Sequence, residues 1–392
     1  YLPLKGASFD GEKFINQAFE KGAIGAFCTG DNGTLQVKDT LTAYLQLANY
    51  RRKKLNFTVV AITGSSGKTT TKELAASVLS EKFRTFKTPL NHNNEIGFCQ
   101  TIFEAPDDTE ILVLEMGMRG LGEIELLSKY AEPDITIISN VGTAHIGRLG
   151  SRENIAKAKC EIVKYQRGNI FIAHDDELIK KTVQFSGKKI FYSIKDVKIL
   201  EKDTHYSKFE YYGNIYELNV GGDYNIENAL SAINTGLALR MKVNEIQSGL
   251  KKYAPIEKRW EAVNAGGFEI INDSYNANPE SMRAFIDTIF ELYEKPVVIL
   301  GDMGELGEDE IKYHSELGKY INSHKNLRQD AEILSIGKLS KYITDGVTNC
   351  PAKHFETIEQ AVDYIKNKDT KVQLFLKASR SMKFERIIEE LK

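Results

Sequence analysis

The chain has 392 residues, a formal net charge of −2 and four cysteines. Its length predicts two or three domains. The near-neutral charge excludes a bulk attraction to nucleic acid or to an anionic membrane, so we expect neither as a partner. The cysteines are too widely spaced for a zinc motif or a disulfide framework, which favours a reducing cytoplasm. No apolar run is long enough to span a bilayer, so we expect no membrane insertion.

Residues 1–54 have the pattern of the back half of a small α/β unit. Apolar residues at helical spacing predict helices over residues 14–19 and 41–48, and a short strand is expected at residues 23–28. The chain starts at Tyr1, without a methionine, and enters an apolar stretch at once. We therefore expect that it begins inside a longer protein.

A glycine-rich turn between a strand and a helix is the strongest functional signal. The β-branched run Thr58–Ile62 predicts a buried parallel strand, and residues 63–71 read TGSSGKTTT and open a helix over residues 68–83. Strand, glycine turn and helix are the context of a phosphate-binding loop. The position of the usual first glycine is Ile62, so the loop is a shortened variant. A structural turn with an incidental Gly-Lys-Thr is the alternative, which this context disfavours.

The residue types of this turn suit phosphate chemistry. Gly64 and Gly67 let the backbone approach an anion, and consecutive N–H groups at a helix N-terminus carry partial positive charge. Lys68 can reach the outer phosphates, and the Thr69 hydroxyl can ligate Mg²⁺. The sequence therefore predicts that the turn binds a phosphate-bearing ligand together with a metal ion.

Two further polar residues are expected at the ends of neighbouring strands. Buried strands are predicted over residues 111–116 and 134–141, with Glu115 near the end of the first and His145 just after the second. Ligands collect at the carboxyl edge of an open parallel sheet, which places both residues to help hold Mg²⁺ near Thr69. A surface glutamate and a loop histidine bonded to backbone are the alternatives for either residue alone. Their shared position favours function.

A lysine on an apolar helix face is harder to explain. Ser151 is expected to cap a helix over residues 152–166, and Lys159 falls in the middle of its apolar stripe of Ile155, Ile162 and Val163. Such a lysine extends its amine to solvent, pairs with a carboxylate, or has a lowered pKa that leaves the amine chemically available. The stripe alone favours the first two explanations.

The second half of the chain predicts a hairpin and a further domain. Residues 205–220 alternate around Gly213-Asn214, which is typical of a β-hairpin, and Asn225 is either the N-cap of the next helix or a ligand contact. From about residue 254, strand, loop and helix units predict a doubly wound domain. The predicted strands are residues 268–273, 297–300 and 372–376. The polar loops that follow them are expected to line a cleft facing the preceding domain.

Ten spaced motifs together resemble the Mur ligases of peptidoglycan synthesis. They are, in order, TGSSGKTT, NHNNEIG, EMG, NVGTAH, AKCEI, GDYNIENA, KRWE, DSYNANP, LGDMGELG and KASR. The resemblance implies a three-domain α/β architecture: a partial N-terminal UDP-substrate domain (residues 1–56), a central ATP-binding domain with a P-loop-type parallel sheet (57–253) and a C-terminal Rossmann-like ligase domain (254–392). Residues 2–11 are similar to the middle of the family's first domain, which implies that the leading uridine-binding segment is absent from this chain.

The resemblance also implies cofactors and residue roles. ATP and Mg²⁺ are the implied cofactors, and catalysis would fall to Lys68, His145, Lys159 and Arg259. The ATP phosphates would contact Gly64, Ser65, Ser66, Gly67, Lys68, Thr69 and Thr70. The metal ligands would be Thr69, Glu115 and His145, together with Lys159 once CO₂ has carbamylated it. The resemblance and the position of Lys159 in the apolar stripe together favour a functional lysine. The nucleotide would also contact Asn225, Arg259, Asp273 and Asn276. The peptide substrates would lie near Asn94, His314, Lys377 and Arg380, for which lysine pairing and capping stay open.

The last four motifs are most similar to those of the family member that joins D-alanyl-D-alanine to UDP-N-acetylmuramoyl-tripeptide. The implied reaction is ATP-dependent amide formation through an acyl phosphate, by a monomer in the bacterial cytoplasm. The GDMGELG and YNANP loops argue against the sister ligase that adds the third amino acid and against folylpolyglutamate synthase. A phosphate-loop kinase is the rival from another class.

Overall fold

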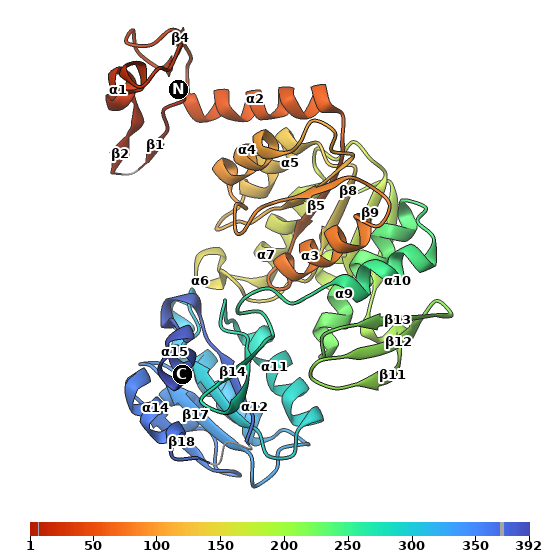
Figure 1. Cartoon of the computed structure of the whole chain (residues 1–392), viewed down its shortest axis with the longest axis vertical. Helices are drawn as coiled ribbons and strands as arrows, with labels where there is room; N and C mark the ends of the chain where they lie inside the picture. Colours follow the sequence, from red (N-terminus) through yellow and green to blue (C-terminus); the bar gives the residue numbers. More distant parts are fainter. Residues whose placement is uncertain (7, 369–371) are drawn as a thin grey trace.

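The computed structural model describes residues 1–6, 8–368 and 372–392, so Ala7 of the 2–11 motif lies outside the described residues. Figure 1 shows a small N-terminal part at one end, a central α/β layer structure below it, and a second α/β layer structure at the other end. The long helix α2 (Thr40–Leu55) carries the chain from the N-terminal part across the central one.

The N-terminal part is built from short elements. They are β1 (Lys5–Gly6), β2 (Phe9–Asp10), η1 (Gly11–Phe14), α1 (Ile15–Glu20), β3 (Phe27–Cys28) and β4 (Leu35–Gln36). The strand predicted at residues 23–28 is confined to its last two residues, because β4 offers a partner only there. The buried apolar residues here are Ile15, Ala26 and Cys28, a small core for this many residues.

The central sheet has six strands in the order β10-β9-β8-β5-β7-β6, and every pair of neighbours is parallel. The strands are β5 (Thr58–Thr63), β6 (Thr85–Lys87), β7 (Ile111–Glu115), β8 (Ile135–Ile138), β9 (Ile170–His174) and β10 (Lys188–Tyr192). The strands predicted from residues 58, 111 and 134 are confirmed as β5, β7 and β8. Since β5 lies in the interior of the sheet, the loop that follows it is flanked by the ends of β7 and β8.

Both faces of this sheet are covered by helices because successive side chains of a strand point to opposite sides. Val60 and Ile62 belong to one apolar cluster, and Val59 and Ala61 belong to another. The first face is covered by α3 (Lys68–Leu79), α9 (Asp223–Ala238) and α10 (Val243–Lys252). The helices on the second face are α2, α4 (Glu95–Glu104), α5 (Glu123–Ala131) and α7 (Arg152–Cys160), with α6 (Ile146–Leu149) and α8 (Glu177–Thr182) beside them.

A three-stranded antiparallel sheet follows in the chain. The predicted hairpin is confirmed as β12 (Ser207–Tyr211) and β13 (Asn214–Leu218), and β11 (Lys198–Lys202) adds a third strand. Positive φ angles of 48° at Tyr212 and 71° at Gly213 close the tight turn between the paired strands.

The C-terminal sheet is mixed, with the order β14-β15-β19-β16-β17-β18. Its strands are β14 (Glu261–Ala265), β15 (Phe268–Asn272), β16 (Val297–Gly301), β17 (Glu332–Ile336), β18 (Ala352–Phe355) and β19 (Leu374–Lys377). Its helices are α11 (Pro279–Leu292), α12 (Glu310–Asn322), α13 (Lys341–Thr344), α14 (Ile358–Lys366) and α15 (Glu385–Leu391). The three predicted units are confirmed as β15, β16 and β19. The sequence analysis did not predict the edge strand β14, which is antiparallel because it turns straight back into β15 as a hairpin.

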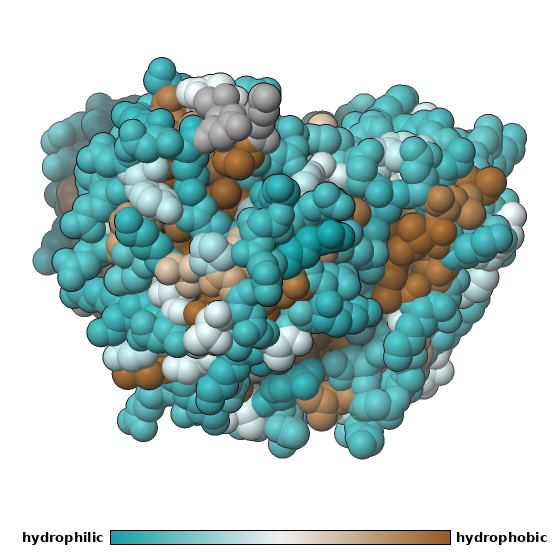
Figure 2. Space-filling model, turned by 90° about the horizontal axis from the view of Figure 1, so that it is seen from below, coloured by the Kyte–Doolittle hydropathy of each residue, from teal (hydrophilic) through white to brown (hydrophobic). Residues whose placement is uncertain are grey.

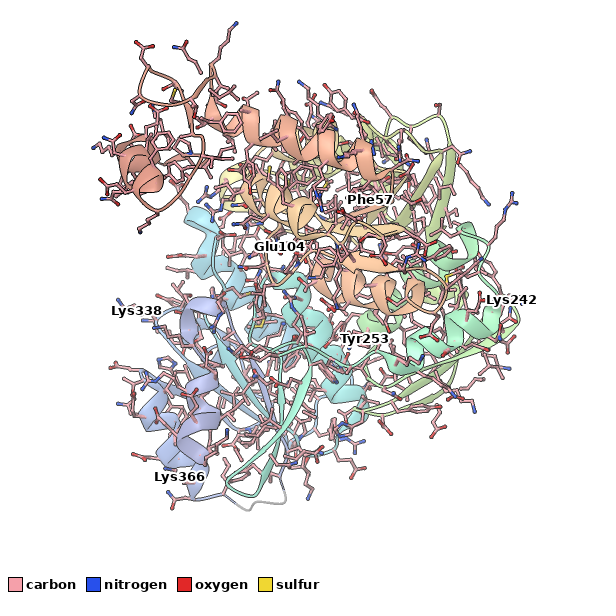
Figure 3. All side chains as sticks on the ribbon, turned by 45° about the horizontal axis from the view of Figure 1, so that its top comes forward. Phe57, Glu104, Lys242, Tyr253, Lys338 and Lys366 are labelled. Carbon is pink, nitrogen blue, oxygen red and sulfur yellow. The ribbon has the colours of Figure 1, made fainter. Side chains whose placement is uncertain are left out.

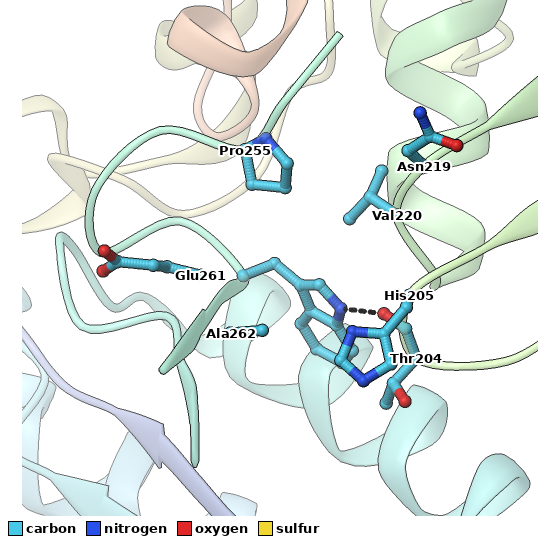
Figure 4. Close-up of a pocket in the computed structure, with 8 residues that line it drawn as sticks. Thr204, His205, Asn219, Val220, Pro255, Glu261 and Ala262 are labelled. Atoms are coloured by element: carbon cyan, nitrogen blue, oxygen red, sulfur yellow. Dashed lines mark hydrogen bonds between the residues drawn. The ribbon is translucent and has the colours of Figure 1, made fainter. Parts of the chain in front are cut away.

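The central and C-terminal parts share one apolar cluster. Trp260, in the linker between them, has its ring 5.7 Å from Tyr224 of α9 and 5.6 Å from Phe285 of α11, both edge to face. Its indole N–H donates to the Thr204 carbonyl at 2.8 Å, a hydrogen bond drawn as the dashed line to Thr204 in Figure 4. Tyr253, after α10, is also buried, and Figure 3 places it where the two parts meet. The junction is therefore packed like a protein interior.

The surface is mostly hydrophilic in the view of Figure 2, which shows a band of apolar residues on the right and smaller apolar patches elsewhere. Large apolar side chains exposed on the three-stranded sheet are Ile199, Leu200 and Ile215. Within the described residues, no helix combines the length and the apolar character needed to cross a membrane.

Trp260 is the single tryptophan of the chain, so native fluorescence reports on this junction. Because the ring is 3% exposed, we expect blue-shifted emission that acrylamide quenches poorly, and a red shift on unfolding in urea. Emission that is red-shifted and freely quenched in the native protein would contradict the packing of the two parts through this residue.

Candidate active site

The glycine-rich turn occupies the end of β5 as predicted, and two close approaches explain its glycines. A Cβ atom on Gly64 would lie 1.8 Å from the Ser139 hydroxyl, and one on Gly67 would lie 2.4 Å from Asn228 Oδ1. Gly67 also has a φ of 75°, a left-handed conformation that suits glycine. Neither position tolerates a side chain without movement of the neighbouring strand end or helix.

The segment after β8 braces this turn from one side. The Asn140 side chain accepts the N–H of Ser65 at 3.1 Å and of Ser66 at 2.9 Å, and donates to the Ser66 hydroxyl at 2.7 Å. The Ser139 hydroxyl donates to the Ser66 carbonyl at 2.6 Å, and the Gly142 N–H donates to the Ser65 hydroxyl at 2.9 Å. The sequence analysis singled out neither Ser139 nor Asn140, although both belong to the strand end that it predicted.

The start of α3 carries no side-chain cap. Its N-cap is Gly67, which has no side-chain acceptor to offer, and within the part of the chain that the structure describes no side chain accepts the first-turn amides of Lys68, Thr69 and Thr70. Since Asn140 already binds the amides of Ser65 and Ser66, the donors open to an anion are those at the helix start. An uncapped helix N-terminus behind a glycine turn is an anion-binding arrangement.

The charge of Lys68 is influenced by charged residues that are distant from it in the sequence. Its half-buried amine donates to the Gly64 carbonyl at 2.8 Å. Burial lowers the pKa of Lys68, the charge of Glu115 opposes this shift, and the charge of Arg259 adds to it. Arg259 belongs to the linker that precedes β14, so these charges lie between the central and C-terminal parts.

Glu115 ends β7 in a buried setting with one free oxygen. Its Oε1 accepts the Asn93 side-chain amide at 2.9 Å, and its backbone N–H donates to the Thr88 hydroxyl at 3.0 Å. Its Oε2 is buried with no hydrogen-bond donor among the described residues, although the Lys72 amine lies 3.8 Å away. A buried carboxylate oxygen without a donor suits a cation. Asn93 and Lys72 were missed by the sequence analysis, and their only signal is position beside the loop.

His145 makes a different contact from the predicted one. Its Nδ1 lies 2.6 Å from Glu305 Oε2 of the C-terminal part, and the imidazole beside it lowers the pKa of Glu305. Both residues have positive φ angles, 65° and 61°, so the backbone on each side is held in an uncommon conformation at this contact. In this arrangement His145 joins two parts of the protein.

Lys159 lies on α7, whose predicted cap is confirmed: the Ser151 hydroxyl accepts the Asn154 N–H at 3.2 Å. The helix is shorter than predicted, because its last turn tightens into the 3₁₀ turn η2 (Glu161–Val163), where Glu161 accepts the Gly122 N–H. Lys159 is 1% exposed, which rules out extension of its amine to solvent. Among the described residues, no carboxylate pairs with it. Burial, and secondly the charge of Lys68, lower its pKa well below that of a free lysine.

Asn225 is not the N-cap that the sequence left open, because α9 begins earlier, behind Gly222. Its buried side chain donates to the Gly221 carbonyl at 2.7 Å. One helical turn further on, Asn228 accepts the Thr71 hydroxyl at 3.2 Å and touches Gly67, so it lies closer to the glycine turn than Asn225 does. The sequence analysis did not single out Asn228.

Arg259 lies between two residues with an uncommon backbone conformation and stacks on the ring of Tyr275. Its neighbours Lys258 and Trp260 have positive φ angles of 62° and 55°, and its guanidinium lies 4.0 Å from the centre of the Tyr275 ring. Its Nε is buried with no acceptor among the described residues. A guanidinium that stacks on a ring and has an unused donor suits a phosphate.

The structure brings three predicted residues of the C-terminal part together. The Lys377 amine donates to Asp273 Oδ2 at 2.5 Å and to the Asn276 carbonyl at 3.3 Å. Lys377 is 3% exposed, so it holds the loop after β15 and is not open to solvent. Asn276 is exposed, and its own side chain accepts the Ala277 N–H at 2.9 Å. Pairing, the alternative kept open for Lys377, describes this geometry.

Three residues predicted near the peptide substrates have structural contacts. Asn94 caps α4 by accepting the Gly97 N–H at 2.9 Å, and exposed Arg380 pairs with Glu385 at 2.6 Å. His314 is fully buried, with Nε2 accepting the Met303 N–H at 2.9 Å and Nδ1 2.7 Å from the Glu310 carbonyl. Both ring nitrogens of His314 are engaged inside the protein, where they support the loop after β16, and its place near the peptide substrates stays a prediction.

The described residues contain no group of three or more His, Cys, Asp or Glu side chains that could hold a metal by themselves. Mg²⁺ characteristically binds one or two protein oxygens and completes its octahedron with water and phosphate. The Thr69 hydroxyl and the free oxygen of Glu115 fit that smaller protein share. The arrangement can therefore bind an anion at the start of α3, with a cation beside it.

A pocket of about 230 Å³ lies beside the linker and is separate from this site (Figure 4). It is lined by Thr204, His205, Asn219, Val220, Pro255, Trp260, Glu261 and Ala262. None of these was a predicted site residue, and the charged cluster around Lys68 does not extend to it.

Comparison with known proteins identifies the family to which this chain belongs. Residues 62–236 match the model of the Mur ligase middle domain, and residues 258–380 match that of the Mur ligase glutamate ligase domain. The chain therefore belongs to the Mur ligase family, and it is an ATP-dependent ligase. This confirms the resemblance and the α/β architecture that it implied.

Individual members of the family are similar to this chain along its whole length. The UDP-N-acetylmuramoyl-tripeptide--D-alanyl-D-alanine ligase of Bacillus subtilis (strain 168) is 37% identical over 419 residues, covering 100% of this chain and 90% of the relative. A crystal structure of MurF from Acinetobacter baumannii has a TM-score of 0.90 and 29% identity, covering 100% of this chain and 90% of that chain. The MurF ligase of Thermotoga maritima in complex with ADP has a TM-score of 0.87 and 28% identity, covering 100% and 93%.

The buried contacts of His314 generate a pH prediction. Burial lowers the pKa of His314, so below about pH 6.5 the unfolded chain binds a proton that the folded chain resists. Its contribution therefore favours folding more as pH rises towards 6.5 and is lost as pH falls.

We expect His314→Gln to cost about 1–3 kcal/mol of unfolding free energy at pH 7, because buried partners are left unpaired. We also expect it to flatten the loss of stability between pH 7 and pH 5. Urea unfolding of both proteins across this range measures the two effects. Parallel curves would show that His314 titrates alike in the folded and unfolded states.

Proposed function

We propose that this chain joins D-alanyl-D-alanine to UDP-N-acetylmuramoyl-tripeptide with ATP, in the peptidoglycan synthesis of the bacterial cytoplasm. The observation that carries the proposal is the uncapped start of α3 behind the glycine turn, with Lys68 as the first residue of the helix. The similarity to MurF proteins along the whole chain supports the assignment of the two substrates. We propose the domain division 1–56, 57–253 and 254–392, and a monomeric protein.

The chemistry follows from an uphill reaction. A carboxylate does not form an amide in water unless its oxygen is first made a leaving group, which transfer of the γ-phosphoryl of ATP to the tripeptide carboxylate achieves. Two negatively charged oxygens meet in that step, so donors must neutralise the charge on the transferring group. The amine of D-alanyl-D-alanine then attacks the acyl phosphate, and inorganic phosphate leaves as the tetrahedral intermediate collapses.

The residues of the turn would bind the phosphates of ATP. We assign the β- and γ-phosphates to the amides at the start of α3, to Lys68 and, from the C-terminal part, to Arg259. When bound, Mg²⁺ would supply charge neutralisation beside them, held by Thr69, Glu115 and His145. His145 would then exchange Glu305 for this role. Asn225, Asp273 and Asn276 would contact the remainder of the nucleotide.

We propose that Lys159 reacts with CO₂ to give a carbamate. A neutral amine is the reactive form, and the lowered pKa of Lys159 favours that form. The product is an anion placed among cationic groups, where it would relieve the repulsion from Lys68 and offer oxygen ligands to a second cation. Near the peptide substrates we retain Asn94, Lys377 and Arg380 as proposals, although each has an internal partner in this structure.

A phosphate-loop kinase is the second candidate, because the turn alone would serve either reaction. The two differ in what they release. A ligase frees inorganic phosphate only when it can consume an amine, whereas a kinase leaves a stable phosphorylated product and needs none. A coupled assay for phosphate therefore separates them.

We expect phosphate release only when ATP, UDP-N-acetylmuramoyl-tripeptide and D-alanyl-D-alanine are all present. Lys68→Ala should lower kcat/KM by roughly 10²–10³-fold, the range for loss of one major electrostatic contact in a transition state. Exposed Lys82→Ala, just beyond the C-terminal end of α3, serves as the control and should keep wild-type activity. Phosphate release that continues without D-alanyl-D-alanine would overturn the proposed function.

For the carbamate, we expect Lys159→Ala to lose activity that added acetate or formate partly restores, because a small carboxylate can occupy the emptied position. Lys157→Ala, on the exposed side of the same helix, is the control and should need no rescue. A carbamate carbon signal in ¹³C NMR of wild type with labelled CO₂, absent from Lys159→Ala, tests the modification without an activity assay. No signal and no rescue would favour a purely structural lysine.

A further inference from the structure

The segment Ser139–Gly147, which we call the connecting segment, touches the glycine turn with its first half and the C-terminal part with its second. Ser139, Asn140 and Gly142 bind the turn, as described above. Thr143 and Gly147 bind residues of the C-terminal part. In Figure 1 the helix α6, which includes Gly147, lies between the two layer structures.

The most specific of the C-terminal contacts is made by Glu280, in the first turn of α11. Its Oε2 accepts the Thr143 N–H at 3.0 Å and the Thr143 hydroxyl at 2.7 Å. Among the described residues, no cation forms an ion pair with this carboxylate. Thr143 is 7% exposed, so the two hydrogen bonds are shielded from water. A charged acceptor with two donors on one residue gives direction as well as affinity.

The contact is linked to the glycine turn by a single residue. The Gly142 N–H donates to the Ser65 hydroxyl at 2.9 Å, and a Cβ atom on Gly142 would lie 2.9 Å from Glu280 Oε2. Glu280 of the C-terminal part and Ser65 of the turn therefore contact the same two consecutive residues, Gly142 and Thr143. A shift of the glycine turn would therefore move the Thr143 donors that Glu280 accepts, and a shift of Glu280 would move the turn.

A second contact lies next to the first but differs in kind. The Gly147 N–H donates to the Glu305 carbonyl at 3.3 Å, and α6 packs against η4 (Gly307–Asp309). This contact uses backbone and close packing, so it remains when the Glu280 side chain is changed. Loss of the Glu280 contact should therefore weaken the docking of the two parts without separating them.

We propose that Glu280 is a positioning residue for ATP: through Thr143 and Gly142 it holds the C-terminal part and the glycine turn in the mutual orientation that binds the phosphates. This rests on the proposed use of the glycine turn for ATP. If the oriented state is only partly populated, nucleotide affinity falls by the lost fraction, because binding must first restore it. A residue that merely stabilised the fold would lower the melting temperature and leave nucleotide affinity unchanged.

The test is a double-mutant cycle on the whole chain, with the Kd of ADP in the presence of Mg²⁺ measured by calorimetry. Glu280→Gln removes the charge and Thr143→Val removes the hydroxyl. We expect each to raise Kd by about 5–20-fold, a usual size of coupling between sites. The double variant should be no weaker than the weaker single variant, because both changes break one contact.

Glu294→Gln is the matched control, since Glu294 follows the same helix, pairs with Arg328 within the C-terminal part, and should leave Kd unchanged. Trp260 fluorescence checks that each variant keeps the packed junction. A wild-type Kd in Glu280→Gln, or additive effects in the double variant, would overturn the positioning role. Phosphate release without D-alanyl-D-alanine would overturn only the proposed function, and failure of wild type to bind ADP would overturn both.

Discussion

The hydrogen bonds from Asn140 to the glycine turn are the interaction on which the site depends. A turn that binds phosphate must leave helix amides uncapped, and uncapped buried amides make a backbone unstable unless something else holds it. Asn140 and Ser139 hold the turn through the amides of Ser65 and Ser66 and the carbonyl of Ser66, away from the helix start. Support and ligand binding are thereby divided between two halves of one short loop, and the amides of Lys68 to Thr70 stay free of side-chain caps.

The charges around the turn are arranged for an anion. Lys68, Lys159 and Arg259 raise the positive potential in a half-enclosed space, and the pKa values of both lysines are lowered mainly by burial. Glu115 opposes this potential with one oxygen occupied by Asn93 and the other without a donor. Like charges kept together at the expense of stability are characteristic of functional sites, where a ligand supplies the missing counter-charge.

The site is completed only where two parts of the chain meet. Arg259 and Glu305 come from beyond the central sheet, and Trp260 packs between Tyr224 and Phe285 at the same junction. The connecting segment binds both the glycine turn and the C-terminal part, through Gly142 on one side and Thr143 on the other. An acyl phosphate is destroyed by water, so a site formed between two closing parts suits the proposed chemistry.

The sequence by itself determined the glycine turn, the strands beside it and the hairpin around Gly213, because strand periodicity, turn residues and helix starts are local properties of the chain. It also set Lys159 apart, since a charged residue in an apolar stripe is visible without coordinates. Only the tertiary structure decided which partner each polar residue has. His314 became a buried support, Lys377 paired with Asp273, and His145 met Glu305, while Asn140, Asn93, Asn228 and Glu280 entered the description of the site. The physical reason is that a hydrogen bond between residues distant in the chain depends on how sheets and helices pack, and no local pattern encodes that geometry.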